Sequence, residues 1–133
     1  MTLSPALTKA LTEFEALDRT FGPGGYKLSD FLSPEKAKNH CSSVASSLCT
    51  FLQNKGLMAQ LVAVQGLKTP PTHPSSAYPS DYDWGHFGHT VVVCEGWWID
   101  YTARQISMDY IDFPYVEDAR TALGQWKYLG YTS

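Results

Sequence analysis

The sequence predicts one α+β domain over residues 1–133, with helices in the N-terminal part and a small antiparallel β-sheet after them. Apolar residues recur at helical spacing in two stretches of the N-terminal part. Runs rich in Val, Ile, Trp, Tyr and Thr follow at 57–64, 89–102 and 125–131, and these residue types favour strands. A hydrophobic content of 44% in 133 residues is enough for a single buried core.

The first helix is expected over residues 5–20. Ser4-Pro5 combines a preferred N-cap residue with proline at the first helical position. Four apolar side chains then recur along one face: Leu7, Leu11, Phe14 and Leu17. Gly22-Pro23 ends this helix.

A second helical region follows Ser33-Pro34, which repeats the same start signal. It is either one long helix or two pieces with a break near Asn39-His40. Within residues 41–54 one apolar stripe is clear, formed by Val44, Ala45, Leu48, Phe51 and Leu52. Gly56 ends it. A further short helix is expected over 116–123, before the last strand.

The strongest local signal is a β-hairpin in which Glu95-Gly96 joins the runs 89–94 and 97–102. If Cys94 lies opposite Trp97, the register makes His89 and Asp100 diagonal neighbours on one face. Diagonal pairs are roughly 7–8 Å apart, close enough for an imidazole and a carboxylate to meet. Cys94 lies on the opposite face.

A carboxylate that binds one imidazole nitrogen fixes the tautomer and leaves the other nitrogen free to accept a proton, which is half of a nucleophilic triad. The alternative is that His89 and Asp100 are merely solvated at strand ends. The missing group is a nucleophile, and the chain has three cysteines. Such an odd, low number argues against a disulfide framework and for a reducing compartment.

Cys41 is the best candidate nucleophile. If a helix begins near residue 40, the helix dipole and the unpaired N–H groups of the first turn stabilise a thiolate there. Cys49 lies in the middle of the same helix, and Cys94 faces away from His89. Both are expected to be packed structural residues, and that interpretation also stays open for Cys41.

The stretch from Gly88 to Gln105 resembles one found in papain-like toxin and transglutaminase-like cysteine enzymes. Its pattern, H-x-V-V followed by G-x-x-I-D-x-T-A-R-Q, is present here from His89 onward. The resemblance covers roughly residues 33–110. It implies a helix that carries Cys41 as the nucleophile, packed on an antiparallel sheet that carries His89 as the base and Asp100 as the orienting acid.

The resemblance also implies a thiol-dependent hydrolase or acyltransferase of the peptidase, deamidase or transglutaminase type, with no cofactor or metal. Its substrate would be a protein, a peptide, or a small amide or ester. The glutamine that papain-like peptidases place before the cysteine is absent, so Asn39 or a backbone N–H would supply the second oxyanion donor. Gln105 is a structural residue or a further polar group of the site, and Trp84 and Trp98 are candidates for substrate binding.

The loop over residues 68–88 is rich in proline and contains Tyr78, Tyr82, Trp84 and Phe87. These aromatic side chains either wall a pocket or anchor the loop to the core. The loop supports an alternative function, a catalytically inactive interaction module that binds a partner through it. A zinc site at His86 and His89 is a further alternative, but no recognised ligand spacing supports it.

Composition excludes other classes of function. The net charge is −3 and no run of Lys or Arg is present, so nucleic-acid binding is not expected. No apolar stretch reaches the roughly 20 residues that span a bilayer. Because no signal peptide is visible, the expected location is the cytoplasm, or outside the cell as an effector or toxin exported without a cleavable signal.

Overall fold

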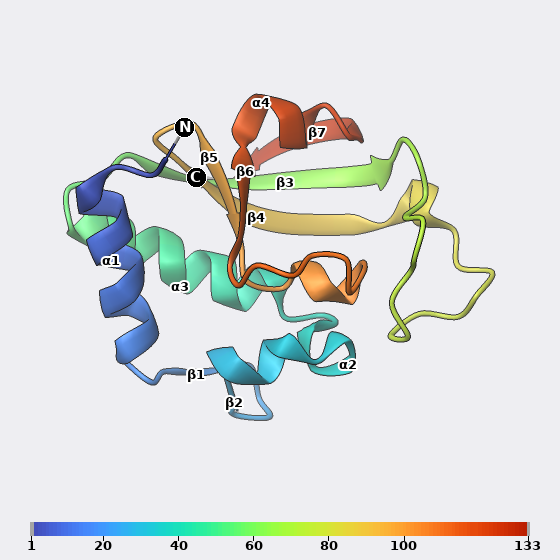
Figure 1. Cartoon of the computed structure of the whole chain (residues 1–133), viewed down its shortest axis with the longest axis horizontal. Coiled ribbons are helices and arrows are strands. Elements are labelled where there is room, and N and C mark those ends of the chain that lie inside the picture. Colours follow the sequence, from blue (N-terminus) through green and yellow to red (C-terminus); the bar gives the residue numbers. More distant parts are fainter. Residues whose placement is uncertain (1, 133) are drawn as a thin grey trace.

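A five-stranded antiparallel sheet with strand order β6-β5-β4-β3-β7 forms the centre of the structure (Figure 1). The computed structural model describes residues 2–132, with side chains through residue 130. The helices are α1 (Pro5–Ala16), α2 (Pro34–Ala37), α3 (Cys41–Asn54) and α4 (Ala119–Leu123). The main sheet contains β3 (Ala59–Leu67), β4 (Gly88–Cys94), β5 (Trp97–Asp100), β6 (Tyr115–Asp118) and β7 (Trp126–Thr132). The α+β class is therefore as predicted.

Short elements complete the chain. A two-stranded ribbon pairs β1 (Thr20–Phe21) with β2 (Tyr26–Lys27). Three 3₁₀ helices cover Leu28–Leu32, Trp84–His86 and Ala103–Gln105. Within residues 2–132 no helix has the length and apolar character needed to cross a bilayer.

Several predicted boundaries were wrong for local reasons. The first helix ends at Ala16 rather than near residue 20, and Asp18 then adopts a left-handed φ of 55°. For the second helical region, the alternative of two pieces with a break near Asn39-His40 is confirmed, because Asn39 has a φ of 68° that no α-helix contains. The helix expected at 116–123 begins only at Ala119, since residues 115–118 instead pair with the free edge of β5.

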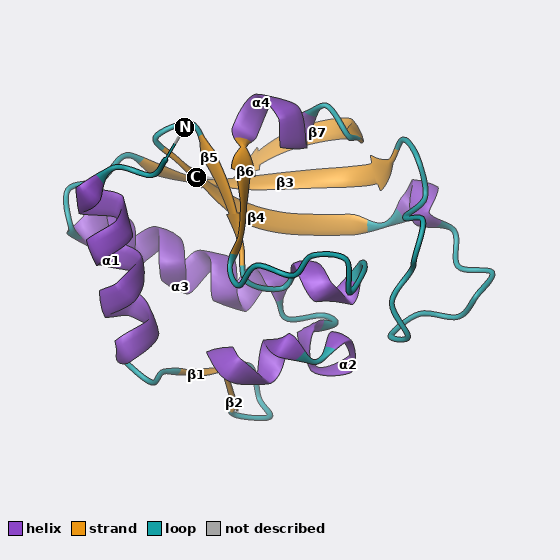
Figure 2. Ribbon diagram, viewed as in Figure 1, coloured by secondary structure: helices purple, strands orange, loops and turns teal. Residues whose placement is uncertain are grey.

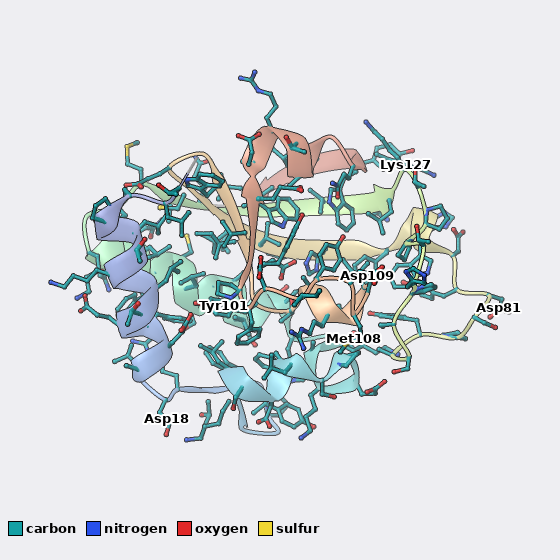
Figure 3. All side chains as sticks on the ribbon, in the orientation of Figure 1. Asp18, Asp81, Tyr101, Met108, Asp109 and Lys127 are labelled. Atoms are coloured by element: carbon teal, nitrogen blue, oxygen red, sulfur yellow. The ribbon has the colours of Figure 1, made fainter. Side chains whose placement is uncertain are left out.

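Two apolar cores lie on the two faces of the main sheet. On one face α1 and α3 pack against β4 and β5 (Figure 2). This first core contains Cys49 and Cys94, and Tyr101 crosses it to donate a hydrogen bond to Glu15 at 2.7 Å (Figure 3). The second core covers the other face and contains, among others, Val62, Val91, Trp98, Trp126 and Ala122.

The loop between β3 and β4 extends beyond the sheet, with Asp81 at its outer end (Figure 3). Ser75 attaches this loop to the segment after β5. The Ser75 N–H donates to the Ile106 carbonyl at 2.8 Å, and the Ser75 hydroxyl donates to the Gln105 carbonyl. Trp84 and Phe87 are buried in the second core, with Tyr78 and Tyr82 packed against them. These aromatic residues anchor the loop to the core.

Gly66 is the tightest point between this loop and the sheet. Its N–H donates to the Phe87 carbonyl at 2.8 Å, its φ is +78°, and a Cβ there would lie 2.5 Å from the Gly85 carbonyl oxygen. Gly56 offers a matched comparison, because its φ is +83° but nothing lies within 4 Å of its Cβ position. Of these two glycines, only Gly66 would bring an added side chain against backbone.

We expect Gly66→Ala to lower the free energy of unfolding by at least about 3 kcal/mol, since left-handed strain and a backbone clash add together. Gly56→Ala carries only the strain and should cost about 1–2 kcal/mol. Urea denaturation of both variants measures the difference. Equal losses at the two positions would contradict the close packing of β3 against the loop.

Candidate active site

The β4–β5 hairpin fixes where His89 and Asp100 lie. Glu95 and Gly96 have φ values of 55° and 81°, the left-handed pair that a two-residue type I′ turn requires. Cys94 pairs with Trp97, so the predicted register is confirmed. The alternation of side chains along the strands then places His89 and Asp100 on the face of the second core.

The imidazole and the carboxylate are joined directly. Nε2 of His89 lies 2.6 Å from Oδ2 of Asp100, and the two side chains are 0% and 4% exposed. The other carboxylate oxygen of Asp100 accepts the backbone N–H of Thr102 at 2.8 Å and its hydroxyl at 3.2 Å. Both oxygens are thus fixed, and the interpretation that His89 and Asp100 are merely solvated is wrong.

Aromatic side chains enclose the imidazole. The ring of His89 stacks on Phe87 at 5.6 Å and on Trp126 at 5.9 Å between ring centres, and Trp98 lies 6.5 Å away. Such packing excludes water from the His89–Asp100 pair, which strengthens its electrostatic attraction.

The pKa of His89 follows from these surroundings. Burial lowers it, but the charge and hydrogen bond of Asp100, with a further contribution from Cys41, outweigh burial. The net effect is a pKa raised above the ordinary 6.5. His89 is therefore held as an imidazolium near neutral pH.

Cys41 is the first residue of α3 and lies at the point where β5 separates from β4. In an antiparallel ladder, Thr90 directs its N–H to the same side as Val92, toward β5. The pairing of β4 with β5 ends at Val92 and Ile99, and Cys41 lies beside Thr90, whose N–H helps to lower the pKa of the Cys41 thiol. The sulphur thus occupies a position on the strand edge beside His89.

The pKa of the Cys41 thiol is lowered. Partial burial raises it, but the His89 side chain and the Thr90 N–H together outweigh that effect. The pKa values of Cys49 and Cys94 are instead raised by burial. Of the three cysteines, all with free thiols, only Cys41 is placed to be a thiolate near neutral pH.

Nδ1 of His89 is the nitrogen left for Cys41, because Nε2 faces Asp100. This atom is buried and forms no hydrogen bond of ordinary geometry within the described residues, although its ring interacts with the Cys41 thiol. The Cys41 thiol is close enough to influence the His89 imidazole, but the two groups do not form an aligned hydrogen bond. Catalytic hydrogen bonds are often loose in this way before a substrate binds.

The N-terminus of α3 has free backbone donors. No side chain caps it in the described chain, since the N-cap residue His40 is turned away. The His40 ring packs on Tyr26 and Phe31, and its Nδ1 lies 3.0 Å from the Lys38 carbonyl. The N–H groups of the first turn, which have no partner within a helix, are therefore available to an oxyanion.

A cleft of about 490 Å³ opens at Cys41. It is bordered by the start of α3 and by three neighbouring strands of the sheet. Its lining residues are Cys41, Ser42, Ala63, Val64, Gln65, Gly88, His89, Thr90, Tyr128, Leu129 and Gly130. The proposed nucleophile and base thus share one opening.

The other predicted site residues lie away from this cleft. Asn39 is exposed in the turn before α3, and Trp84 and Trp98 are buried in the second core. Gln105 is buried, and its side-chain oxygen accepts a hydrogen bond from the Tyr78 hydroxyl at 3.3 Å. Trp98 acts on the site indirectly, through its packing beside His89.

The zinc alternative finds no support in the described residues, which contain no group of three or more His, Cys, Asp or Glu arranged to hold a metal ion. His86 is exposed and pairs with Asp83. Cys94 is buried in the first core, on the other side of the sheet from His89.

Sequence reasoning missed two groups that shape the site, Thr102 and the backbone of Thr90. The pattern Asp-x-Thr signals an Asx turn, in which an aspartate accepts the N–H two residues later, and it could have indicated Thr102. No local signal points to Thr90 or to the lining residues of β3 and β7.

No protein family matches the sequence, and no similarity was found to a curated protein or to a solved structure.

Proposed function

We propose that this protein is a thiol-dependent hydrolase or acyltransferase that uses Cys41, His89 and Asp100 on an amide, isopeptide or ester bond. The observation that carries the proposal is the buried contact between His89 and Asp100 beside a cysteine whose pKa is lowered. A buried ion pair in a cleft, next to a nucleophile at a helix N-terminus, is the arrangement such chemistry needs.

We further propose that the fold is of the papain-like or transglutaminase-like type. In support, α3 carries Cys41 and packs on the antiparallel sheet, while β4 and β5 carry His89 and Asp100. The order of these residues along the chain and the resemblance of residues 88–105 agree with this assignment.

The reaction would begin with attack of the Cys41 thiolate on a carbonyl carbon. The oxygen that gains the negative charge would accept hydrogen bonds from N–H groups of the first turn of α3. His89 would then donate its proton to the departing amine or alcohol as the carbon–heteroatom bond breaks. This leaves a thioester on Cys41.

The second half reverses the proton transfer. Water or an amine would lose its proton to His89 and attack the thioester carbonyl, and the Cys41 thiolate would leave. Asp100 keeps its negative charge throughout, orients the imidazole and stabilises its charged form. Hydrolysis and acyl transfer differ only in whether water or an amine resolves the thioester.

The test is the rate of alkylation of each cysteine by iodoacetamide between pH 4.5 and 9, read by mass spectrometry. Because the pKa of Cys41 is lowered, we expect it to react well below the free-thiol pKa of about 8.5. In His89→Ala this advantage should be lost, with a fall of about 100-fold at pH 6 as the thiolate fraction drops.

Cys49 and Cys94 are internal controls, since both are buried and their pKa values are raised. If Cys41 reacted no faster than these two at pH 6, or equally fast without His89, the thiolate–imidazolium pair would not exist. The interaction module would then be the better account of the protein.

A further inference from the structure

The cleft beside Cys41 is much larger than one reacting carbonyl needs. The helix α3 begins at Cys41, so the sheet face that it covers continues uncovered beyond that residue. Thr90 and Gly88 lie on the same face as Val92 and Cys94 of the first core. Ala63 pairs with both Thr90 and Gly130, so three strands form one continuous surface there.

Small side chains give this surface its depth. We define the cleft floor as Ala63, Gly88 and Gly130. A Cβ at Gly88 would meet nothing within 4 Å, and one at Gly130 would have the Ala63 carbonyl oxygen as its nearest neighbour at 3.7 Å. Both glycines avoid the left-handed region, so larger side chains there would fill the cleft without straining the backbone.

The charge of the lining points to one kind of occupant. Apart from Cys41 and His89, whose opposite charges offset each other, none of the described residues that border the cleft is ionisable at neutral pH. Tyr128, at its edge, is a large aromatic side chain that remains 66% exposed. Exposed apolar surface of this kind beside a reactive site is typical of ligand binding.

The position of the cleft ties it to the reacting group. Cys41 lines it, and the β4 segment 88–90, which carries His89, borders it as well. A chain bound along this surface would therefore lie directly beside the Cys41 sulphur.

We propose that this cleft binds an uncharged, mainly apolar chain of the substrate, adjacent to the reacting carbonyl, and that the cleft floor determines how large that chain is. This inference rests on the proposed function, because it takes Cys41 as the reacting group. It names the substrate class, namely acyl compounds whose portion next to the reacting bond is extended and neutral.

The experiment compares three alkylating reagents on the full chain: iodoacetamide, N-hexyl iodoacetamide and N-(5-carboxypentyl) iodoacetamide. In each case the Cys41 thiolate displaces iodide and forms a carbon–sulphur bond. Full burial of one methylene is equivalent to roughly fourfold in binding. We expect the hexyl reagent to modify Cys41 at least about tenfold faster than iodoacetamide, and the carboxylate reagent to lose most of that gain.

Substitution of the cleft floor tests the location. In Gly130→Leu, and separately in Gly88→Leu, the ratio of the hexyl rate to the iodoacetamide rate should fall to about one. Lys127→Leu is the control, because it adds a leucine to β7 at a position that does not line the cleft, and it should keep the wild-type ratio. Circular dichroism establishes that each variant is folded.

The outcomes separate the two proposals. Slow reaction of Cys41 with iodoacetamide in the wild type would overturn the proposed function. Fast reaction without a gain from the hexyl chain, or a gain that survives in both folded glycine variants, would overturn the inference about the cleft and leave the proposed function standing.

Discussion

Replacement of Cys41 by alanine is expected to lower the hydrolysis of a small activated ester, such as p-nitrophenyl acetate, at least about 1000-fold. Of the three cysteines in the described residues, Cys41 is the one whose thiol pKa is lowered, and it borders the same cleft as His89. Without its sulphur, no group at the start of α3 can form the covalent intermediate. Steady-state rates at pH 7 measure the loss.

The fold should tolerate this change. Cys41 is only partly buried, and its alanine variant removes one sulphur atom at the edge of the cleft. The matched control is Cys49→Ala, which removes the same atom from the first core and should lower stability while retaining activity. Activity that persisted in Cys41→Ala would exclude this cysteine as the nucleophile.

Asp100→Asn is expected to have the second-largest effect, a loss of turnover on the order of 1000-fold. The amide keeps the shape of the carboxylate but removes the charge that raises the pKa of His89. Burial, the largest single influence and one that lowers that pKa, would then be opposed only by the smaller effect of Cys41. The pKa of His89, followed by NMR, should therefore move from above 6.5 in the wild type to below 6.5 in the variant.

In Asp100→Asn, the contribution of His89 to the pH dependence of stability should change sign. In the wild type, the raised pKa of His89 contributes stability that is complete below about pH 6.5 and is lost as the pH rises through the folded-state value. In Asp100→Asn the contribution of His89 should instead lower the free energy of unfolding as the pH falls below about 6.5, because only the unfolded state readily takes up the proton.

Asp109→Asn provides the control for both measurements. Asp109 also pairs with a histidine, His73, at 2.8 Å, but both side chains are exposed. Its loss should leave the Cys41 alkylation rate and the titration of His89 unchanged. An unchanged His89 pKa in Asp100→Asn would show that the buried contact does not control the imidazole.

The sequence alone determined the features that depend on local chemistry. Glu95-Gly96 imposes a type I′ turn, and this turn fixes the pairing of β4 with β5. Since side chains alternate with period two, the same turn places His89 and Asp100 on one face. The start of a helix at Cys41 could also be predicted, because an apolar stripe follows it and the expected break near Asn39 precedes it.

Only the tertiary structure decided which residues meet across long distances in the chain. Trp84 and Trp98 looked equally suited to a binding surface, but packing buries both in the second core. A helix was expected from residue 116, yet residues 115–118 form a strand that pairs with the free edge of β5. Local preferences are worth a few tenths of a kcal/mol per residue, and tertiary contacts outweigh them.

The candidate site shows the same division. The contact between His89 and Asp100 lies within one hairpin and follows from its register, whereas Cys41 comes from a helix 48 positions before His89. Its approach to the imidazole depends on how α3 packs on the sheet and on where β5 leaves β4. The cleft depends further on β3 and β7, which join beside β4 only in the folded chain, because hydrogen bonding between distant strands has no counterpart in local sequence.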